Sequence, residues 1–212
     1  MINNSLWERT MVICPHTDDE FGCAGTIDKI IRQGSEVVYV AFSRCEMSVP
    51  PAFPEDILEI ECRRCLSYLG LDKEQVHIFG YPVRHFPASR QEILDDLVTL
   101  NHEYKPGLVL IPNSCDTHQD HQTIYEESFR AFKNCSILGY ELPQNLIRFT
   151  NSAFVRLSTE NIERKITALG HYKSQSFRPY SSAEFIKGLA TVRGVQCAHD
   201  YAEAYEVIRL IC

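Results

Sequence analysis

The chain has 212 residues, 44% hydrophobic and 23% charged, which suits one globular domain, 1–212, with a sizeable core. A net charge of −7 does not favour nucleic acid as a partner. No apolar run approaches the roughly 20 residues of a membrane span, and the N-terminal residues MINNSLWERT lack a signal-peptide pattern, so we expect a cytoplasmic protein.

Strands and helices alternate through the first two thirds of the chain. In chain order, the apolar and helical patterns predict a strand at 10–15, a helix at 25–34, a strand at 36–42, a helix at 54–70, a strand at 76–82, a helix at 89–104, a strand at 106–112 and a helix at 121–134. Short connections between alternating elements indicate a Rossmann-like α/β fold. Its doubly wound, mainly parallel sheet would have helices on both faces.

The last third is less regular. It predicts strands near SILGYEL and AFVRLS, a helix over 159–171, a helix over 182–192 and a final strand at AYEVIRLI. The Pro-rich stretch 43–54, after the second predicted strand, is long enough to form a rim or lid. We find no repeat or linker, which favours a single domain.

Nine cysteines are scattered along the chain without the paired CxxC spacing of a structural zinc site. The CRRC stretch, Cys62 to Cys65, falls inside a predicted helix, where small buried side chains are the better interpretation. The same interpretation applies to Cys14 and Cys115. Unpaired cysteines of this kind are typical of a reducing compartment.

The residues that could carry out catalysis are concentrated directly after two of the predicted strands. PHTDDE follows the first strand and NSCDTHQDH follows the fourth, and these are the densest His/Asp clusters in the chain. Three consecutive acids repel one another unless a cation, a helix N-terminus or solvent offsets their charge. Ligands of open α/β sheets bind at the carboxyl ends of strands where the strand order reverses. If the strand order is 3-2-1-4, both clusters meet in one crevice.

The spacing within each cluster favours a metal site. His16 and Asp19 are three residues apart in a tight turn, and His118 and His121 repeat that spacing at a helix start. Two histidines and a carboxylate with open positions suit a catalytic Zn²⁺, although Fe²⁺ or another divalent metal fits the same ligand types. The alternative is that the acids cap a helix and the histidines lie on the surface.

The same two motifs resemble a known family. PHTDDE is similar to the PHPDDE or AHPDDE signature of PIG-L/LmbE-like zinc de-N-acetylases, which include N-acetylglucosaminyl-phosphatidylinositol deacetylases, and THQDH is similar to the HxDH motif of that family. KPGLVLIPNSCDTHQDH resembles the strand and loop before that motif. Weaker similarity at GTI, KITALGHYKSQ and YAEAYEVIR extends the resemblance over nearly the whole chain.

The resemblance implies a role for each motif residue. His16, Asp19 and His121 would be the zinc ligands. Asp18 would be the general base that activates a zinc-bound water, and His118 would stabilise the oxyanion or protonate the leaving group. Glu20 and Asp120 would support the site, the latter as a partner of a ligand histidine.

Some positions depart from the family pattern. Thr17 replaces the usual proline, and Leu58 stands where many relatives have a substrate-binding arginine in an Arg-x-x-Glu pattern that ends here at Glu61. Arg156 replaces an aspartate. Weaker candidates for contact with a sugar or phosphate are Arg148, Arg156, Arg193 and Tyr201.

We therefore expect a zinc-dependent hydrolase that removes the acetyl group from an N-acetylated amino sugar, such as a GlcNAc conjugate or a sugar nucleotide. Its partner would be this small molecule, and the chain could form a homo-oligomer. One alternative is a zinc amidase or esterase with a non-sugar acyl substrate. Another is a non-catalytic nucleotide-binding module, which is weakened because FGCAGT lacks dinucleotide-site spacing and no Walker motif occurs.

Overall fold

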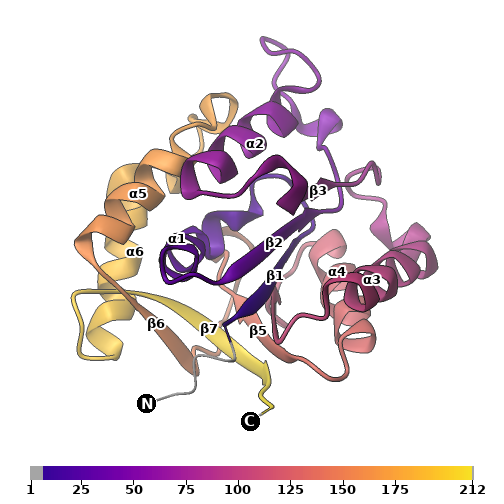
Figure 1. The fold of residues 1–212 in the computed structure, drawn as a ribbon. Helices are drawn as coiled ribbons and strands as arrows, with labels where there is room; N and C mark the ends of the chain where they lie inside the picture. Colours follow the sequence, from indigo (N-terminus) through magenta and orange to yellow (C-terminus); the bar gives the residue numbers. More distant parts are fainter. Residues whose placement is uncertain (1–6, 212) are drawn as a thin grey trace.

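Seven strands form one mixed sheet in the computed structural model, which describes residues 7–211 (Figure 1). The strand order is β3-β2-β1-β4-β5-β7-β6. The strands are β1 (Arg9–Cys14), β2 (Glu36–Ala41), β3 (Val76–Ile78), β4 (Leu108–Pro112), β5 (Ser136–Tyr140), β6 (Ala153–Leu157) and β7 (Tyr201–Arg209). Strands β1 to β5 run parallel to their neighbours, and β7 pairs antiparallel with both β5 and β6. The predicted α/β, mainly parallel architecture is confirmed.

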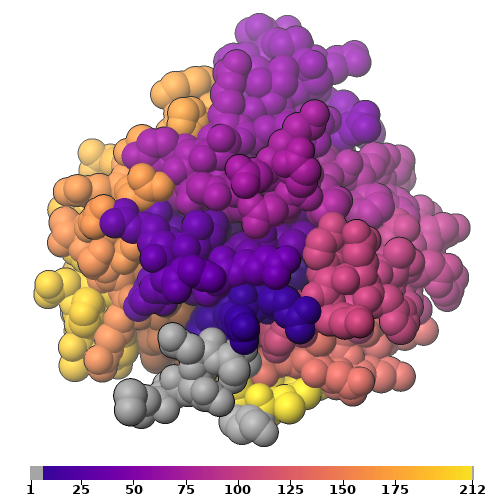
Figure 2. Space-filling view, viewed as in Figure 1, coloured from indigo at the N-terminus to yellow at the C-terminus, as the bar shows by residue number. Residues whose placement is uncertain are grey.

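Within residues 7–211, six α-helices cover the two faces of this sheet. They are α1 (Ala24–Arg32), α2 (Ile57–Leu69), α3 (Arg90–Tyr104), α4 (Gln119–Ala131), α5 (Thr159–Leu169) and α6 (Ala183–Gln196). One apolar core lies beneath α1, α2, α5 and α6, and a second lies beneath α3 and α4 (Figure 1). Side chains of neighbouring elements fill the spaces between the ribbons (Figure 2). Among residues 7–211, no helix has the length and apolar character needed to cross a bilayer.

The strand order reverses between β1 and β4. Strand β1 pairs with β2 on one side and with β4 on the other, which is the 3-2-1-4 order expected from the sequence. The carboxyl ends of β1 and β4 therefore lie side by side. The segments that follow these two strands carry the two His/Asp clusters.

Most predicted elements differ from the structure at one or both ends, and among the strands β3 and β7 differ most. Strand β3 ends at Ile78 instead of residue 82. Beyond that end, the amide of Phe79 still donates to the last residue of β2 at 2.8 Å, and the amide of Tyr81 donates to the residue that follows β2 at 3.0 Å. Pro82 has no amide hydrogen and cannot continue the ladder. Strand β7 begins at Tyr201, earlier than AYEVIRLI suggested, because it pairs with β6 along five residues.

A buried carboxylate ties β7 to α1 and α5. Glu203 accepts hydrogen bonds from the amides of Gly25 and Thr26 at 2.9 and 2.7 Å, at the N-terminus of α1. It also pairs with Lys165 at 2.6 Å, and both side chains are nearly inaccessible to solvent. The helix dipole and the ammonium group together stabilise this buried charge. Helix α1 follows the first His/Asp cluster directly, so Glu203 also fixes where that cluster ends.

We expect Glu203→Ala to lower the free energy of unfolding by about 3–5 kcal/mol, since it leaves the Lys165 ammonium buried without a partner. Urea unfolding measures this change, and the milder Glu203→Gln covers the case in which the alanine variant does not fold. Glu163→Ala, at an exposed position of α5, is the control and should change stability by less than about 0.5 kcal/mol. Equal effects of the Glu203 and Glu163 variants would contradict this interpretation.

Candidate metal centre and catalytic pocket

The first cluster folds into a tight turn between β1 and α1. Asp19 begins a short 3-10 helix (Asp19–Gly22) that leads into α1. Its carboxylate folds back, and Oδ2 accepts a hydrogen bond from the backbone amide of His16 at 2.8 Å. This closure places Asp19 Oδ2 3.4 Å from Nδ1 of the His16 ring, and both side chains are buried.

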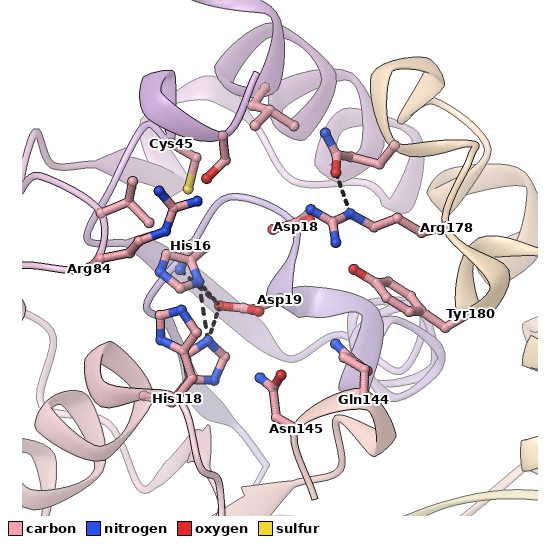
Figure 3. Close-up of a pocket in the computed structure, with 15 residues that line it drawn as sticks. His16, Asp18, Asp19, Cys45, Arg84, His118, Gln144, Asn145, Arg178 and Tyr180 are labelled. Carbon is pink, nitrogen blue, oxygen red and sulfur yellow. Dashed lines mark hydrogen bonds and ion pairs between the residues drawn. The ribbon is translucent and has the colours of Figure 1, made fainter. Parts of the chain in front are cut away.

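The second cluster starts α4. His118 is the N-cap of the helix, and its Nδ1 accepts a hydrogen bond from the amide of Asp120 at 3.2 Å. His121 lies in the first helical turn and points toward β1. Its Nε2 is 3.1 Å from His16 Nδ1 and 3.4 Å from Asp19 Oδ2 (Figure 3). The structure thus brings together the three residues that the family resemblance identifies as ligands.

Two further carboxylates orient the histidine rings. Asp120 Oδ2 is 3.0 Å from Nε2 of His16, and Asp116 Oδ2 is 2.9 Å from Nδ1 of His121. When the rings are neutral and protonated on the outer nitrogen, each carboxylate accepts that N–H and the inner nitrogen keeps a lone pair for a metal ion. Asp120 has the supporting position that the sequence suggested. Asp116 was missed, although it stands only two residues before His118 in the same motif.

These atoms fit a divalent metal ion. Ligand atoms about 2.0–2.1 Å from a tetrahedral zinc lie roughly 3.3 Å from one another. The three separations among His16 Nδ1, His121 Nε2 and Asp19 Oδ2 are 3.1, 3.4 and 3.4 Å. Two lone pairs and a carboxylate facing one another at this distance repel unless a cation or a proton lies between them. The donor types and their spacing therefore match the needs of the metal.

The pKa values of His16 and Asp19 also show that the site favours positive charge. Burial lowers the pKa of His16, but the charge of Asp19 and the hydrogen bond with Asp120 outweigh it and raise that pKa well above its ordinary value. Burial acts against ionisation of Asp19, yet the charges of His121 and His16 lower its pKa to about 2. An anionic Asp19 beside a histidine that tends to hold a proton is a site that stabilises a cation.

His118 also lies close to this cluster. The three histidines present nitrogen atoms that all fall within 4.8 Å of one another. The His118 Nδ1 is occupied as an acceptor, so in the neutral ring the proton is on Nε2. Burial, followed by the charges of His121 and His16, lowers the pKa of His118 to about 4. A neutral ring with a donor N–H suits hydrogen bonding to substrate better than metal ligation.

The other two acids of the first cluster have separate environments. Asp18 is partly exposed and lines the pocket, and burial together with the charge of Asp19 raises its pKa. Glu20 points the other way into the protein, where Oε1 and Oε2 accept hydrogen bonds from the hydroxyls of Tyr172 and Tyr39 at 2.6 and 3.2 Å. Burial raises the pKa of Glu20 to about 7. Glu20 is thus part of the scaffold beneath the site.

Thr17 is held by its backbone. Its carbonyl accepts hydrogen bonds from the hydroxyls of Tyr172 and Tyr39. Its own hydroxyl is buried and has no hydrogen-bond partner among residues 7–211. The two tyrosines fix the turn at the position where relatives have proline, and nothing in the structure explains the threonine side chain itself.

Loops wall the pocket above the cluster, and the sequence identified only one of them, 43–54. Its outer lining is mostly polar and consists of Ser48, Arg84, Gln144, Asn145, Gln175, Arg178 and Tyr180 (Figure 3). Ser48 and Cys45 come from the 43–54 loop, which therefore forms part of the rim. Gln144 and Asn145 follow β5, and the last three residues lie between α5 and α6. Of these residues only Gln175 lies in a stretch with family similarity, at the end of KITALGHYKSQ.

Several weaker sequence candidates lie elsewhere. Arg193 is paired with Glu141, and Arg156 donates to the carbonyl of Cys197 at 3.1 Å. Neither they nor Arg148 and Tyr201 line the pocket. Leu58 does line it, whereas Glu61 accepts hydrogen bonds from the amide and hydroxyl of Ser174. Cys62 and Cys65 are buried free thiols, as expected for packed side chains, and Cys212 lies outside the described residues.

Comparison with known proteins agrees with the fold and the site. The chain is 26% identical over 172 residues to the uncharacterized deacetylase YaiS of Escherichia coli K12, covering 77% of this chain and 90% of that protein. It is 27% identical over 147 residues to the diacetylchitobiose deacetylase of Thermococcus kodakarensis, covering 65% of this chain and 54% of that protein. The structure of the N,N'-diacetylchitobiose deacetylase from Pyrococcus horikoshii superposes with a TM-score of 0.79 at 21% identity, covering 95% and 84% of the two chains.

A histidine–carboxylate cluster at the switch point of a doubly wound α/β sheet is the arrangement of a metal-binding active site. The family described as PIG-L, GlcNAc-PI de-N-acetylase, matches residues 11–132, which include both His/Asp motifs and more than half of the chain. The chain belongs to the PIG-L family and is a metal-dependent deacetylase. The resemblance drawn from PHTDDE and THQDH is thereby confirmed.

We expect Asp116→Asn and Asp120→Asn each to weaken metal binding by about 10- to 100-fold, because each frees a ligand histidine to rotate or change tautomer. Competition with a fluorescent zinc chelator measures the affinity, and circular dichroism checks that the variants are folded. Glu126→Gln, at an exposed position of the same helix, serves as the control and should bind metal as the wild type does. Unchanged affinity in both aspartate variants would rule out this orienting role.

Proposed function

We propose that the chain removes the acetyl group from an N-acetylated amino sugar and releases acetate and the free amine. The observation that carries the proposal is the convergence of His16, Asp19 and His121 beside Asp18 and His118 at the floor of one open polar pocket. The two diacetylchitobiose deacetylases among its relatives support a sugar substrate.

His16, Asp19 and His121 would hold the metal, and zinc is the metal that the family resemblance implies. A divalent ion bound there polarises the amide carbonyl and lowers the pKa of a water molecule. Asp120 and Asp116 keep the two ligand histidines in the tautomer that this binding needs. Fe²⁺ is compatible with the same ligand types.

Asp18 is the acid that stays free of the metal cluster and faces the pocket. Its carboxylate takes the proton from the attacking water, and its raised pKa makes it a stronger base than an ordinary aspartate. The same proton is then available to the departing amine. His118 donates its Nε2–H to the oxygen that becomes negatively charged as the water adds to the carbonyl.

The outer walls suit a sugar. Side-chain amides of Gln144, Asn145 and Gln175 and the hydroxyl of Ser48 offer both donors and acceptors. Tyr180 adds a ring and a hydroxyl on the side of the pocket next to Asp18 (Figure 3). Ring hydroxyls of an amino sugar need this kind of mixed lining.

We expect zinc-loaded protein to release acetate from N-acetylglucosamine conjugates or nucleotide-linked N-acetyl sugars, and Asp18→Asn to lower kcat by about 10²- to 10⁴-fold because the general base is lost. Acetate release measures the rate, and elemental analysis measures the metal content, which should be unchanged in the variant. Metal-depleted protein and Asp95→Asn, at an exposed site on α3, are the controls. Hydrolysis of simple esters or non-sugar amides with no acetate from any N-acetyl sugar would contradict the proposal.

His118 can be separated from the metal ligands. We expect His118→Gln to lower kcat by about 10²- to 10³-fold, the usual effect of losing an oxyanion donor, while the purified variant keeps its metal. His121→Gln should instead lose the metal. Loss of metal from the His118 variant to the same extent would show that His118 is a ligand and not an oxyanion donor.

A further inference from the structure

Two arginines line the pocket without a carboxylate partner. Arg84 and Arg178 stand on different walls, with their guanidinium groups drawn toward the space above His16 and Asp18 (Figure 3). Within residues 7–211, neither forms an ion pair, whereas Arg90, Arg164 and Arg193 each pair with a buried acid. The positive charge of these two pocket arginines is therefore available to a ligand.

A hydrogen bond to a buried side chain fixes the position of the Arg178 guanidinium group. Its Nε donates to Oε1 of Gln175 at 2.6 Å, and Gln175 is buried. The neighbouring Ser174 is fixed to Glu61 of α2 by two hydrogen bonds of 3.0 and 2.6 Å. The guanidinium carbon also lies 5.8 Å from the centre of the Tyr180 ring. No acid among residues 7–211 forms an ion pair with the terminal nitrogens of Arg178, which lie near the Tyr180 hydroxyl and present a planar fork to a planar or tetrahedral oxyanion.

Arg84 reaches the pocket from an uncommon backbone conformation. Its φ is +71°, in the left-handed region that favours glycine. The Arg84 amide donates to Asp120 Oδ2 at 2.5 Å, and its carbonyl accepts from Gln119 at 3.4 Å. Asp120 also orients the His16 ring, so the turn that presents Arg84 is attached to the metal site. A long cationic side chain at a strained position beside the pocket indicates a functional requirement.

With a divalent metal bound, the pocket carries a net positive charge, because Asp18 and Asp19 offset only the charges of the two arginines. Its two acidic lining residues are Asp18 and Asp19, and both are committed to the reaction. Arg178 acts on Asp18 only as a nearby charge, without an ion pair to it. A neutral sugar that filled the pocket would remove water from both guanidinium groups and offer them no negative charge. A phosphate or carboxylate would satisfy them with charge-assisted hydrogen bonds.

We propose that the substrate is an N-acetyl amino sugar that bears a phosphate or a carboxylate, and that Arg178 binds this anionic group while Arg84 adds a second positive charge at the opening. This inference rests on the proposed function, since it takes the N-acetyl group to lie at the metal centre. Arg178 and Arg84 would select the substrate, and the residues at the pocket floor would carry out the hydrolysis.

The test compares acetate release from four substrates by the zinc-loaded protein. Methyl N-acetylglucosaminide is neutral, N-acetylglucosamine 1-phosphate and 6-phosphate carry the phosphate at either end of the ring, and N-acetylmuramic acid carries a carboxylate. We expect at least one anionic substrate to have a kcat/KM about 10- to 100-fold above that of the neutral one, the range expected from charge-assisted hydrogen bonds. The preferred member of the set distinguishes phosphate from carboxylate.

Variants assign this preference to residues. In Arg178→Gln the ratio of anionic to neutral kcat/KM should fall about tenfold or more, mainly through KM, and Arg178→Lys should recover part of it because the charge returns without the fork. Arg84→Gln should lower the ratio less. Arg64→Gln, an exposed arginine of α2 outside the pocket, is the matched control and should leave all four rates unchanged.

Calorimetric measurement of the affinity for the amine products tests the anion site independently of the proposed deacetylation. Glucosamine 1-phosphate, glucosamine 6-phosphate and muramic acid should each be compared with methyl glucosaminide, and at least one should bind more tightly to the wild type but not to Arg178→Gln. Equal affinities for neutral and anionic compounds, with acetate still released from the neutral sugar, would overturn the inference and leave the proposed function standing. Selective binding of an anionic product without acetate release from any sugar would support the anion site and overturn the deacetylation.

Discussion

The site is built around two ring nitrogens and a carboxylate oxygen that repel one another unless a cation or a proton lies between them. Nδ1 of His16, Nε2 of His121 and Oδ2 of Asp19 converge within 3.1–3.4 Å, and two further carboxylates force the lone pairs of both rings inward. Such an arrangement costs free energy without a positive charge at its centre. The sheet places the ends of β1 and β4 side by side, so that one cation bound there would offset the charge of both clusters.

The consecutive acids of the first motif are tolerated because the turn separates them. Asp19 folds back onto the His16 amide, Asp18 faces the pocket and Glu20 enters a buried site beneath two tyrosine hydroxyls. Each carboxyl thus has a different environment, and their pKa values move in different directions, down for Asp19 and up for Asp18 and Glu20. A single turn therefore supplies a ligand, a base and a scaffold residue.

The floor of the pocket could be predicted from the sequence, and of its walls only the rim at 43–54 could. Parallel strands carry the residues after them to one edge of the sheet, so the order 3-2-1-4 was enough to bring PHTDDE and THQDH together. Arg178 and Gln175 reach the pocket only because Glu61, more than one hundred residues earlier, holds the Ser174 turn. Side-chain contacts between distant loops leave no periodic pattern. The early start of β7 likewise depends on its pairing with β6 and not on its own residues.

The floor of the pocket controls the reaction, whereas its walls control which substrate is accepted. The proposed metal ligands and Asp18 lie directly after β1 and β4, whose positions are fixed by the central ladder of the sheet. The walls come from loops after β2, β3, β5 and α5, and each loop is anchored by a few polar contacts. A substitution in a wall residue can therefore change which group beyond the acetamide is accepted without moving the metal ligands. Asp120 is the exception, because it holds both the His16 ring and the Arg84 turn, and a change there affects the floor and one wall together.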